Sequence, residues 1–412
     1  MGQLTGVSIN RLEGGLGRRS DNKDSVFALV SCMPLTPLNL EENEAVQLLQ
    51  LSDAEALGVD PGYEENNSIL AHHHLSEIFR LAPNATVYLI GIEPESEGDT
   101  LVKNKIAAIL PTIRANKDIK GIGFVGFDDS LTSIATDIED IQTNLVNALA
   151  SENRFLDFVV LEGKTDGDIV PGSIADLRTK TAPQCSVVIA QDPYIRAIGE
   201  GDYDDYAAVG SALGMLAVRK INENIGSVDV KEKPRTKRGT ADYPLTGGKL
   251  WLSALLSSGQ DAESFSKTDL KTLNDKGYIY AASYEGYAGV YFQNSPTAVA
   301  KTSDYAYIEN NRVWNKAARV IRQALIPVVK GTVKKDPQTG YIKNTTVSYW
   351  EGLVSKALEN MQADDEISGF DFYINPKQIV NDESPVTGKA QIVADGIVHE
   401  FEIDLGLTNQ LG

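Results

Sequence analysis

Three of the four histidines of this chain are consecutive, in the stretch LAHHHLSEIFRLAP at residues 70–83. Imidazole is a common metal ligand and a common general base, so metal binding and catalysis both have to be considered. Apolar residues recur at helical spacing here: Ala71, Leu75, Ile78, Phe79 and Ala82. They predict a helix over residues 68–82, with His73 on its polar face near Glu77 and Arg80. Adjacent helical residues point about 100° apart, so we expect packing histidines and no metal site.

A second candidate is GIGFVG, residues 121–126, which matches the GxGxxG pattern of dinucleotide-binding proteins. That pattern works when the glycines follow a strand and open a helix, because the phosphates then meet free amide groups. Here the glycines lie inside an apparent strand. We expect them to permit close approach of neighbouring backbones, and we expect no cofactor.

The remaining polar clusters point to no chemistry. The acidic run GEGDYDDY, residues 199–206, lacks the ligand spacing of a calcium loop. Cys32 and Cys185 are far apart in sequence and do not form a CxxC pair. Because the sequence also lacks a GxSxG or Walker A motif, we expect no catalytic residue and no enzyme. The rival hypothesis is a nucleotide-binding or metal-binding enzyme, which would depend on His73 or Gly123.

The composition of the chain limits the classes of possible partner. The 412 residues carry a formal net charge of −19 at pH 7, with 42% apolar and 23% charged residues. Such an acidic chain repels phosphate backbones, so we expect no nucleic-acid partner. The sequence has no apolar run of about 18 residues and no secretory signal, so we expect no membrane insertion and folding in the cytoplasm.

The order of elements predicts an α/β fold. From residue 84 to residue 230, short β-branched runs alternate with longer amphipathic runs, which is typical of a mostly parallel sheet covered by helices. Charged residues, Pro and Gly then replace this pattern over residues 231–245. This basic linker contains KEKPRTKR, which is either a solvated connector or a site for an acidic surface of a neighbouring subunit. Aromatic-rich strands and two helices follow, one of them around Trp314, and predict an α+β C-terminal domain.

Both ends of the chain resemble β arms without a cover. Near the C-terminus, two β runs flank Asp395-Gly396, a dipeptide typical of hairpin turns. One face of the second run carries Ile397, His399, Phe401, Ile403 and Leu405. Near the N-terminus, Val7 and Ile9 belong to a β run too short to form a domain. We expect these residues to make contacts between subunits.

Several segments, in order, resemble the contractile tail sheath proteins of bacteriophages and related injection machines. They are GVSINRLEGGLGR, LSDAEALGVD, HHHLSEIFRLAPNATVYLIGI, AAVGSALGMLAVRKINENIG, LKTLNDKGYIYAASYEGYAGVYFQN and DYAYIENNRVWNKAARVIRQAL. The resemblance covers most of the chain and fits the branch without large inserted surface domains. With it, the expected division is an N-terminal assembly arm 1–24, an α/β sheath domain 25–230, a basic linker 231–245, an α+β domain 246–380 and a C-terminal β-hairpin arm 381–412.

The resemblance implies a function. Such a subunit would form hexameric rings of itself, stacked helically around a tail tube protein, and would contract to drive the tube through the host envelope. Baseplate and tail terminator proteins would be further partners, and the location would be the virion tail, assembled in the host bacterial cytoplasm. Terminal arms would add strands to sheets of neighbouring subunits. A phage-derived injection or bacteriocin device is the alternative setting.

Overall fold

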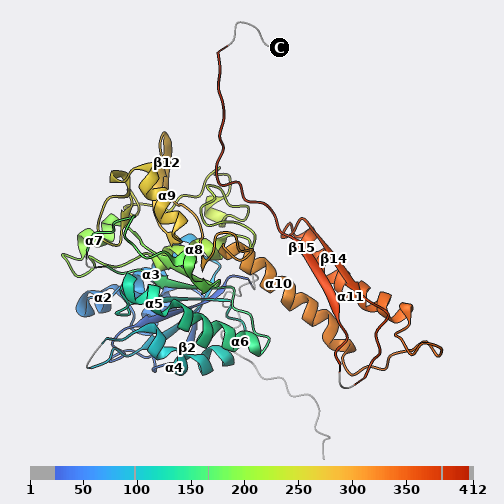
Figure 1. Cartoon of the computed structure of the whole chain (residues 1–412). Coiled ribbons are helices and arrows are strands. Elements are labelled where there is room, and N and C mark those ends of the chain that lie inside the picture. Colours follow the sequence, from blue (N-terminus) through green and yellow to red (C-terminus); the bar gives the residue numbers. More distant parts are fainter. Residues whose placement is uncertain (1–23, 97–98, 166, 382–383, 408–412) are drawn as a thin grey trace, which may run out of the picture.

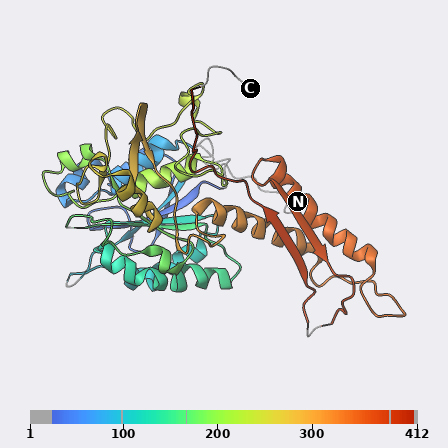
Figure 2. The same cartoon turned by 45° about the horizontal axis from the view of Figure 1, so that its top comes forward.

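The computed structural model describes residues 24–96, 99–165, 167–381 and 384–407. It consists of a large α/β body, residues 24–307, and a smaller C-terminal unit, residues 326–393. Helix α10 (Ile308–Leu325) joins the two, and residues 394–407 extend away from both (Figures 1 and 2). The predicted N-terminal assembly residues, Val7 and Ile9, lie outside the described residues.

The body is built on a seven-stranded sheet with the order β10-β7-β5-β4-β1-β3-β2. All its pairings are parallel except that of β3 with β2 at one edge. In chain order the strands are β1 (Val26–Cys32), β2 (Ala45–Leu48), β3 (Thr86–Ile92), β4 (Gly121–Val125), β5 (Phe158–Glu162), β7 (Cys185–Val188) and β10 (Tyr278–Ile279). The predicted mostly parallel, helix-covered sheet is therefore confirmed.

Both faces of this sheet are buried, because consecutive residues of a strand point to opposite faces. In β1, Phe27 and Leu29 enter one core, whereas Ala28 and Val30 enter the other. Helices α3 (Ala71–Leu81) and α8 (Val209–Val218) cover the first face. Helices α4 (Val102–Ala115) and α5 (Leu131–Ile141) cover the second (Figure 2).

Shorter elements complete the body. Its other helices are α1 (Leu51–Ala56), α2 (Pro61–Asn67), η1 (Gln142–Asn147), α6 (Ala148–Ser151), η2 (Leu177–Thr179), α7 (Pro193–Ile198), η3 (Arg235–Lys237), η4 (Ala262–Ser264) and α9 (Lys267–Asp275). Three two-stranded sheets pair β6 (Thr181–Ala182) with β13 (Ala298–Val299), β8 (Ala190–Gln191) with β9 (Leu255–Leu256), and β11 (Ala281–Tyr284) with β12 (Tyr287–Phe292).

The residues on both sides of the predicted linker 231–245 share one core. Strand β10 forms the edge of the main sheet beside β7, and Trp251 and Phe292 pack in the same cluster as Phe27 of β1. The boundary between two hydrophobic cores lies at α10 instead. The first half of α10 is buried in the body, whereas its later apolar residues, such as Ile321, pack in the core of the C-terminal unit.

The C-terminal unit is a pair of helices beside a pair of strands. After η5 (Ile326–Val328), helix α11 (Asn344–Ala363) runs alongside α10 and is followed by antiparallel strands β14 (Gly369–Ile374) and β15 (Gly388–Val393). The hairpin predicted at Asp395-Gly396 is wrong, because β15 pairs with β14 and no strand follows it within residues 394–407.

Candidate assembly site

The surroundings of the three histidines favour a packing role. Burial lowers the pKa of His73 and of His74 to about 3, so both rings are neutral near pH 7. His74 Nδ1 accepts a hydrogen bond from Gly210 N at 3.1 Å, and His72 Nε2 lies 3.3 Å from Glu55 Oε1. In the part of the chain that the structure describes, no group of His, Cys, Asp or Glu side chains could hold a metal ion.

The predicted polar face of α3 is in fact buried. Glu77 is fully covered, and its Oε2 accepts hydrogen bonds from Ser211 Oγ at 2.7 Å and from Trp251 Nε1 at 3.2 Å. Helix α8 causes this burial, because it packs directly against α3 and is itself buried along nearly its whole length. A Cβ atom at Gly210 would lie 2.4 Å from the carbonyl oxygen of His74. Close packing of the two helices therefore replaces solvent beside Glu77.

The GxGxxG residues lie in the sheet, as predicted. Gly121 and Gly123 belong to β4, between β1 and β5, and helix α5 begins only at Leu131. A Cβ atom at Gly121 would lie 2.2 Å from the ring of Phe158, and one at Gly126 would lie 2.6 Å from the carbonyl oxygen of Cys32. The close approach is thus partly to backbone and partly to side chains.

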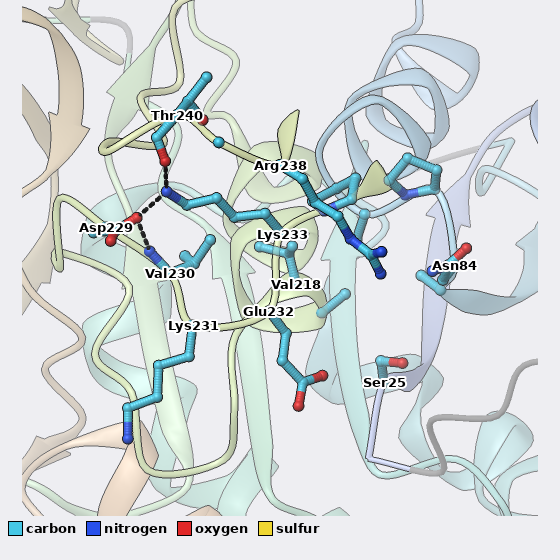
Figure 3. A pocket seen from close by; sticks show the side chains of 16 residues that line it. Ser25, Asn84, Val218, Asp229, Val230, Lys231, Glu232, Lys233, Arg238 and Thr240 are labelled. Carbon is cyan, nitrogen blue, oxygen red and sulfur yellow. Dashed lines mark hydrogen bonds and ion pairs between the residues drawn. The ribbon is translucent and has the colours of Figure 1, made fainter. Parts of the chain in front are cut away.

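The basic linker borders a groove of about 640 Å³ on the body. Arg238 points into this groove beside Asn84, whereas Lys233 turns to Asp229, with 2.5 Å between Lys233 Nζ and Asp229 Oδ1 (Figure 3). The acidic run 199–206 lies elsewhere on the body, where Asp202 Oδ2 accepts a hydrogen bond from Ser68 Oγ at 2.7 Å. Some charged side chains of both segments therefore have partners within the same chain.

The C-terminal segment, which we define as residues 396–407, exposes an apolar face. Phe401 is 80% exposed, Ile403 79% and Leu405 94%, although such side chains are usually buried. Ile397 is half-buried, and the ring centroid of His399 lies 5.1 Å from that of Tyr307. The five assembly residues predicted near the C-terminus thus follow one another along an extended, largely uncovered segment.

Asp395 fixes the direction in which this segment leaves. Its Oδ1 accepts a hydrogen bond from Ser368 Oγ in the C-terminal unit, and its Oδ2 accepts one from Asn222 Nδ2 in the body, both at 2.6 Å. These two bonds and the contact of His399 with Tyr307 lead the chain toward the body and away from the outer edge of β15.

The outer edge of β15 is open in the described part of the chain. In the β14–β15 ladder, Phe370 is opposite Ile392 and Phe372 is opposite Ala390, and these side chains face the helices. On the far side of β15 from β14, a groove of about 590 Å³ separates the strand from α10. Apolar side chains line it: Val313, Trp314, Ala317, Ala318, Ile321, Ala390 and Ile392. We call this groove with the edge of β15 the assembly groove.

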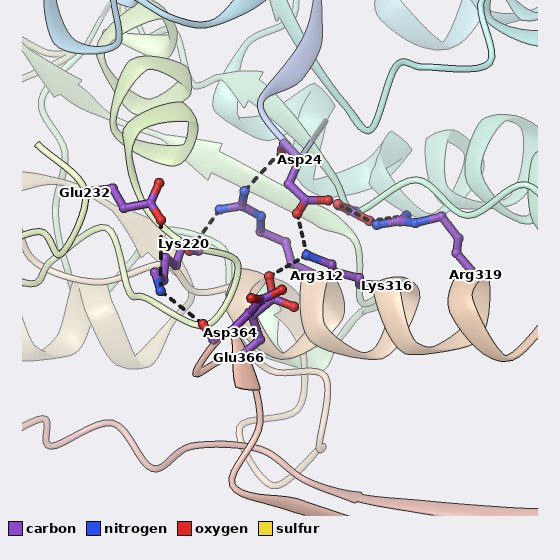
Figure 4. A network of polar contacts seen from close by, with 9 residues as sticks. Asp24, Lys220, Glu232, Arg312, Lys316, Arg319, Asp364 and Glu366 are labelled. Carbon is purple, nitrogen blue, oxygen red and sulfur yellow. Dashed lines mark hydrogen bonds and ion pairs between the residues drawn. The ribbon is translucent and has the colours of Figure 1, made fainter. Parts of the chain in front are cut away.

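A polar network holds α10 to the parts around it (Figure 4). Lys316 Nζ lies 2.6 Å from Asp24 Oδ2, at the start of the body, and also contacts Glu366, in the turn before β14. Arg319 Nη1 lies 2.8 Å from Asp157 Oδ1, whose side chain is fully buried. Lys316 therefore links the start of the body, α10 and the C-terminal unit. Sequence reasoning found α10 but not this network, because its members are far apart in the chain.

Sequence comparison assigns the chain to a family. The N-terminal domain of DUF2586 matches residues 4–296, and its C-terminal domain matches residues 304–412. The chain belongs to the DUF2586 family. Over 167 residues it is also 26% identical to a protein of Haemophilus phage HP1 described as "Putative tail sheath protein". That match spans 40% of this DUF2586 chain and 39% of the length of the phage protein.

Solved structures share the fold of this DUF2586 protein. It resembles a chain of the PVC sheath complex of an extracellular contractile injection system, with a TM-score of 0.60 and 14% identity, covering 100% of this chain and 98% of the other. It also resembles a chain of the helical sheath of the anti-feeding prophage, with a TM-score of 0.59, 14% identity and 100% of both chains covered. Both sheaths are in the contracted state. The resemblance to contractile tail sheath proteins predicted from the sequence is confirmed.

Among the described residues, none of the helices has the length and apolar character needed to cross a membrane.

Proposed function

We propose that this protein is the structural subunit of a contractile sheath that polymerises helically. The observation that carries the proposal is an exposed apolar β-type segment on the same chain as an open strand edge above an apolar groove. Each subunit thus presents both halves of one contact. Such a head-to-tail contact repeats without closing when the rotation between subunits does not return to the start, and it then forms a filament.

In this proposal, the C-terminal segment of one subunit adds to the outer edge of β15 in another. The added strand would satisfy the free main-chain groups of β15, and Phe401, Ile403 and Leu405 would cover the apolar floor of α10. Trp314, which is 44% exposed, would be the largest side chain on that floor. This is the pairing that a hairpin at Asp395-Gly396 would make within one chain, transferred to a neighbour.

The setting follows from the relatives. We propose hexameric rings stacked around a tail tube protein, with baseplate and tail terminator proteins at the ends, in a virion tail assembled in the host bacterial cytoplasm. The fold neighbours from contractile injection systems support the sheath fold, and the α+β C-terminal domain and the terminal arms are part of the proposal. A phage-derived injection device is the alternative setting. The proposed role is mechanical and requires no catalytic residue.

The test uses matched variants of the C-terminal segment. Phe401→Ser with Ile403→Ser removes apolar side chains, whereas Glu400→Ser with Glu402→Ser changes neighbouring acidic residues. We expect negative-stain microscopy to show tubes or rings for the wild type and the acidic-face variant, and only dispersed subunits for the apolar-face variant. Normal polymers from the apolar-face variant would refute strand addition by this segment.

A complementation experiment separates the two halves of the contact. Ala318→Asp places a charge in the assembly groove, and deletion of residues 397–412 removes the segment. We expect neither variant to polymerise alone. An equimolar mixture should form a one-to-one complex in sedimentation, because one partner supplies the intact groove and the other the intact segment. Two variants that stay monomeric in the mixture would contradict the proposed contact.

A further inference from the structure

A second groove, of about 670 Å³, lies between the body and the C-terminal unit on the side of Lys220. We call it the acidic groove, because five carboxylates line it: Asp24, Glu232, Asp364, Asp365 and Glu366. Two cationic side chains, Arg219 and Lys220, line it with them, and Lys316 already pairs with Asp24 and Glu366, so the unpaired charge lies mainly on Glu232, Asp364 and Asp365. The lining therefore has an excess of negative charge.

The two cations neutralise little of this charge. Arg219 is buried, and its guanidinium donates to the backbone carbonyl oxygens of Ser227 and Asp229, not to a carboxylate. Lys220 Nζ is 3.9 Å from Glu232 Oε1 and donates to the carbonyl oxygen of Asp364 at 3.0 Å. In the described part of the chain, the exposed carboxylates of Asp364 and Asp365 form no ion pair.

One carboxylate in the wall of the groove, that of Glu366, is incompletely satisfied. Its side chain is only 9% exposed, and its Oε1 contacts Lys316. Its Oε2 is buried without a hydrogen-bond partner. A buried carboxylate oxygen without a donor is unfavourable, because the loss of hydration is not compensated. The groove therefore combines surplus negative charge with an unsatisfied acceptor in its wall.

We propose that the acidic groove binds the Arg18–Arg19 pair of the N-terminal segment of the same chain. Asp24 is the first described residue and lines the groove itself, so the preceding segment starts at its rim. Arg19 is five residues earlier, which is within about 17 Å of extended chain. Guanidinium groups match carboxylates in charge and can donate two parallel hydrogen bonds to one of them.

This contact would define where the N-terminal segment becomes free. Residues before Arg18 could reach a neighbour, whereas Arg18 and Arg19 would tie the segment to the body at Glu232 and to the C-terminal unit at Asp364 and Asp365. The inference goes beyond the proposed sheath role and does not depend on it, because the binding occurs within a single subunit.

Limited trypsin digestion of the dilute, unassembled full-length chain tests the proposal. Mass spectrometry measures the rate of cleavage after Arg19 in the wild type and in Asp364→Asn with Asp365→Asn. Asparagine tolerates the positive φ of 56° at Asp365, so the turn is retained. We expect cleavage after Arg19 to be about tenfold faster in the variant, because cleavage follows the open population of the segment. Cleavage after Arg11 should be unchanged.

Three controls make the result decisive. Glu359→Gln with Asp371→Asn changes the same net charge in the C-terminal unit outside the groove, and it should cleave like the wild type. Raising NaCl from about 0.05 M to about 0.5 M should accelerate cleavage after Arg19 in the wild type more than in the groove variant. Equal cleavage rates in wild type and groove variant would overturn the proposal. Protection that disappears on tenfold dilution would also overturn it, because a second copy would then be the occupant.

Discussion

Replacement of Lys316 by methionine tests how firmly the C-terminal unit is joined to the body. Lys316 Nζ contacts both Asp24 and Glu366, and each of the three side chains is less than a quarter exposed. Methionine keeps the length of the apolar stem but removes the charge, which leaves two carboxylates facing each other. Exposed ion pairs contribute about 0 to 1 kcal/mol, whereas breaking a buried pair costs about 3 to 5 kcal/mol. For this partly buried site we expect a loss of about 2 to 3 kcal/mol.

The loss should depend on pH with a definite sign. Burial opposes ionisation of Asp24, but the charge and hydrogen bond of Lys316 reverse this and hold the pKa of Asp24 below its ordinary value. A lowered carboxyl pKa stabilises the folded state above the ordinary pKa, and this contribution disappears as the pH falls through the folded-state value. The difference between wild type and Lys316→Met should therefore be largest near neutral pH and should shrink below about pH 4.

Urea unfolding followed by tryptophan fluorescence measures this difference, since Trp314 lies on α10 close to Lys316. The control is Lys356→Met on α11, where the exposed lysine forms no ion pair with a described residue, and we expect a change below about 0.5 kcal/mol. A Lys316→Met variant as stable as this control at pH 7 would refute the linking role. A stability difference that grew as the pH fell would refute the assigned electrostatics.

Other predictions concern the body. Gly210→Val should lower the melting temperature by several degrees at every pH, because the added Cβ would lie 2.4 Å from the carbonyl oxygen of His74. An unchanged melting curve would contradict the close packing of α3 and α8. Burial raises the pKa of Glu64 to about 8, so folding stability should decline as the pH rises from about 4.5 to 8. Glu64→Gln should flatten that decline. A variant whose stability falls with pH as steeply as that of the wild type would contradict the raised pKa of Glu64. EDTA should leave the melting temperature unchanged, whereas a decrease would indicate a structural metal.

The sequence predicted the parallel sheet well because its strands are fully buried. Runs such as Val26–Cys32 and Phe158–Glu162 are apolar on both faces, and this pattern needs no knowledge of tertiary neighbours. Sequence reasoning failed for Glu77, because helical periodicity cannot show that a second, buried helix covers the polar face. The buried carboxylate of Glu77 is instead paired with Arg80 and accepts further hydrogen bonds from Ser211 and Trp251.

The candidate assembly residues were chosen by residue type, and their contacts with a neighbouring subunit remain a prediction. Phe401, Ile403 and Leu405 are exposed, but so are Val398, Glu400 and Glu402 on the other face, so exposure does not single out the predicted face. The hairpin was wrong because the Asp-Gly turn signal is local, whereas Asp395 is held by Ser368 and Asn222, which are distant in sequence. The assembly groove and the acidic groove both depend on how α10 places the C-terminal unit. No sequence pattern specifies that placement.

The most direct test of the proposed sheath contact is a cryo-electron microscopy reconstruction of the polymer formed by the purified protein at rising concentration. We expect tubes of uniform width in which residues 397–407 of one subunit form a strand along the outer edge of β15 in another. Phe401 and Ile403 should then face Trp314 and Ala318 of α10. A protein that remains monomeric at high concentration, or a polymer in which residues 397–407 contact only their own subunit, would contradict this contact.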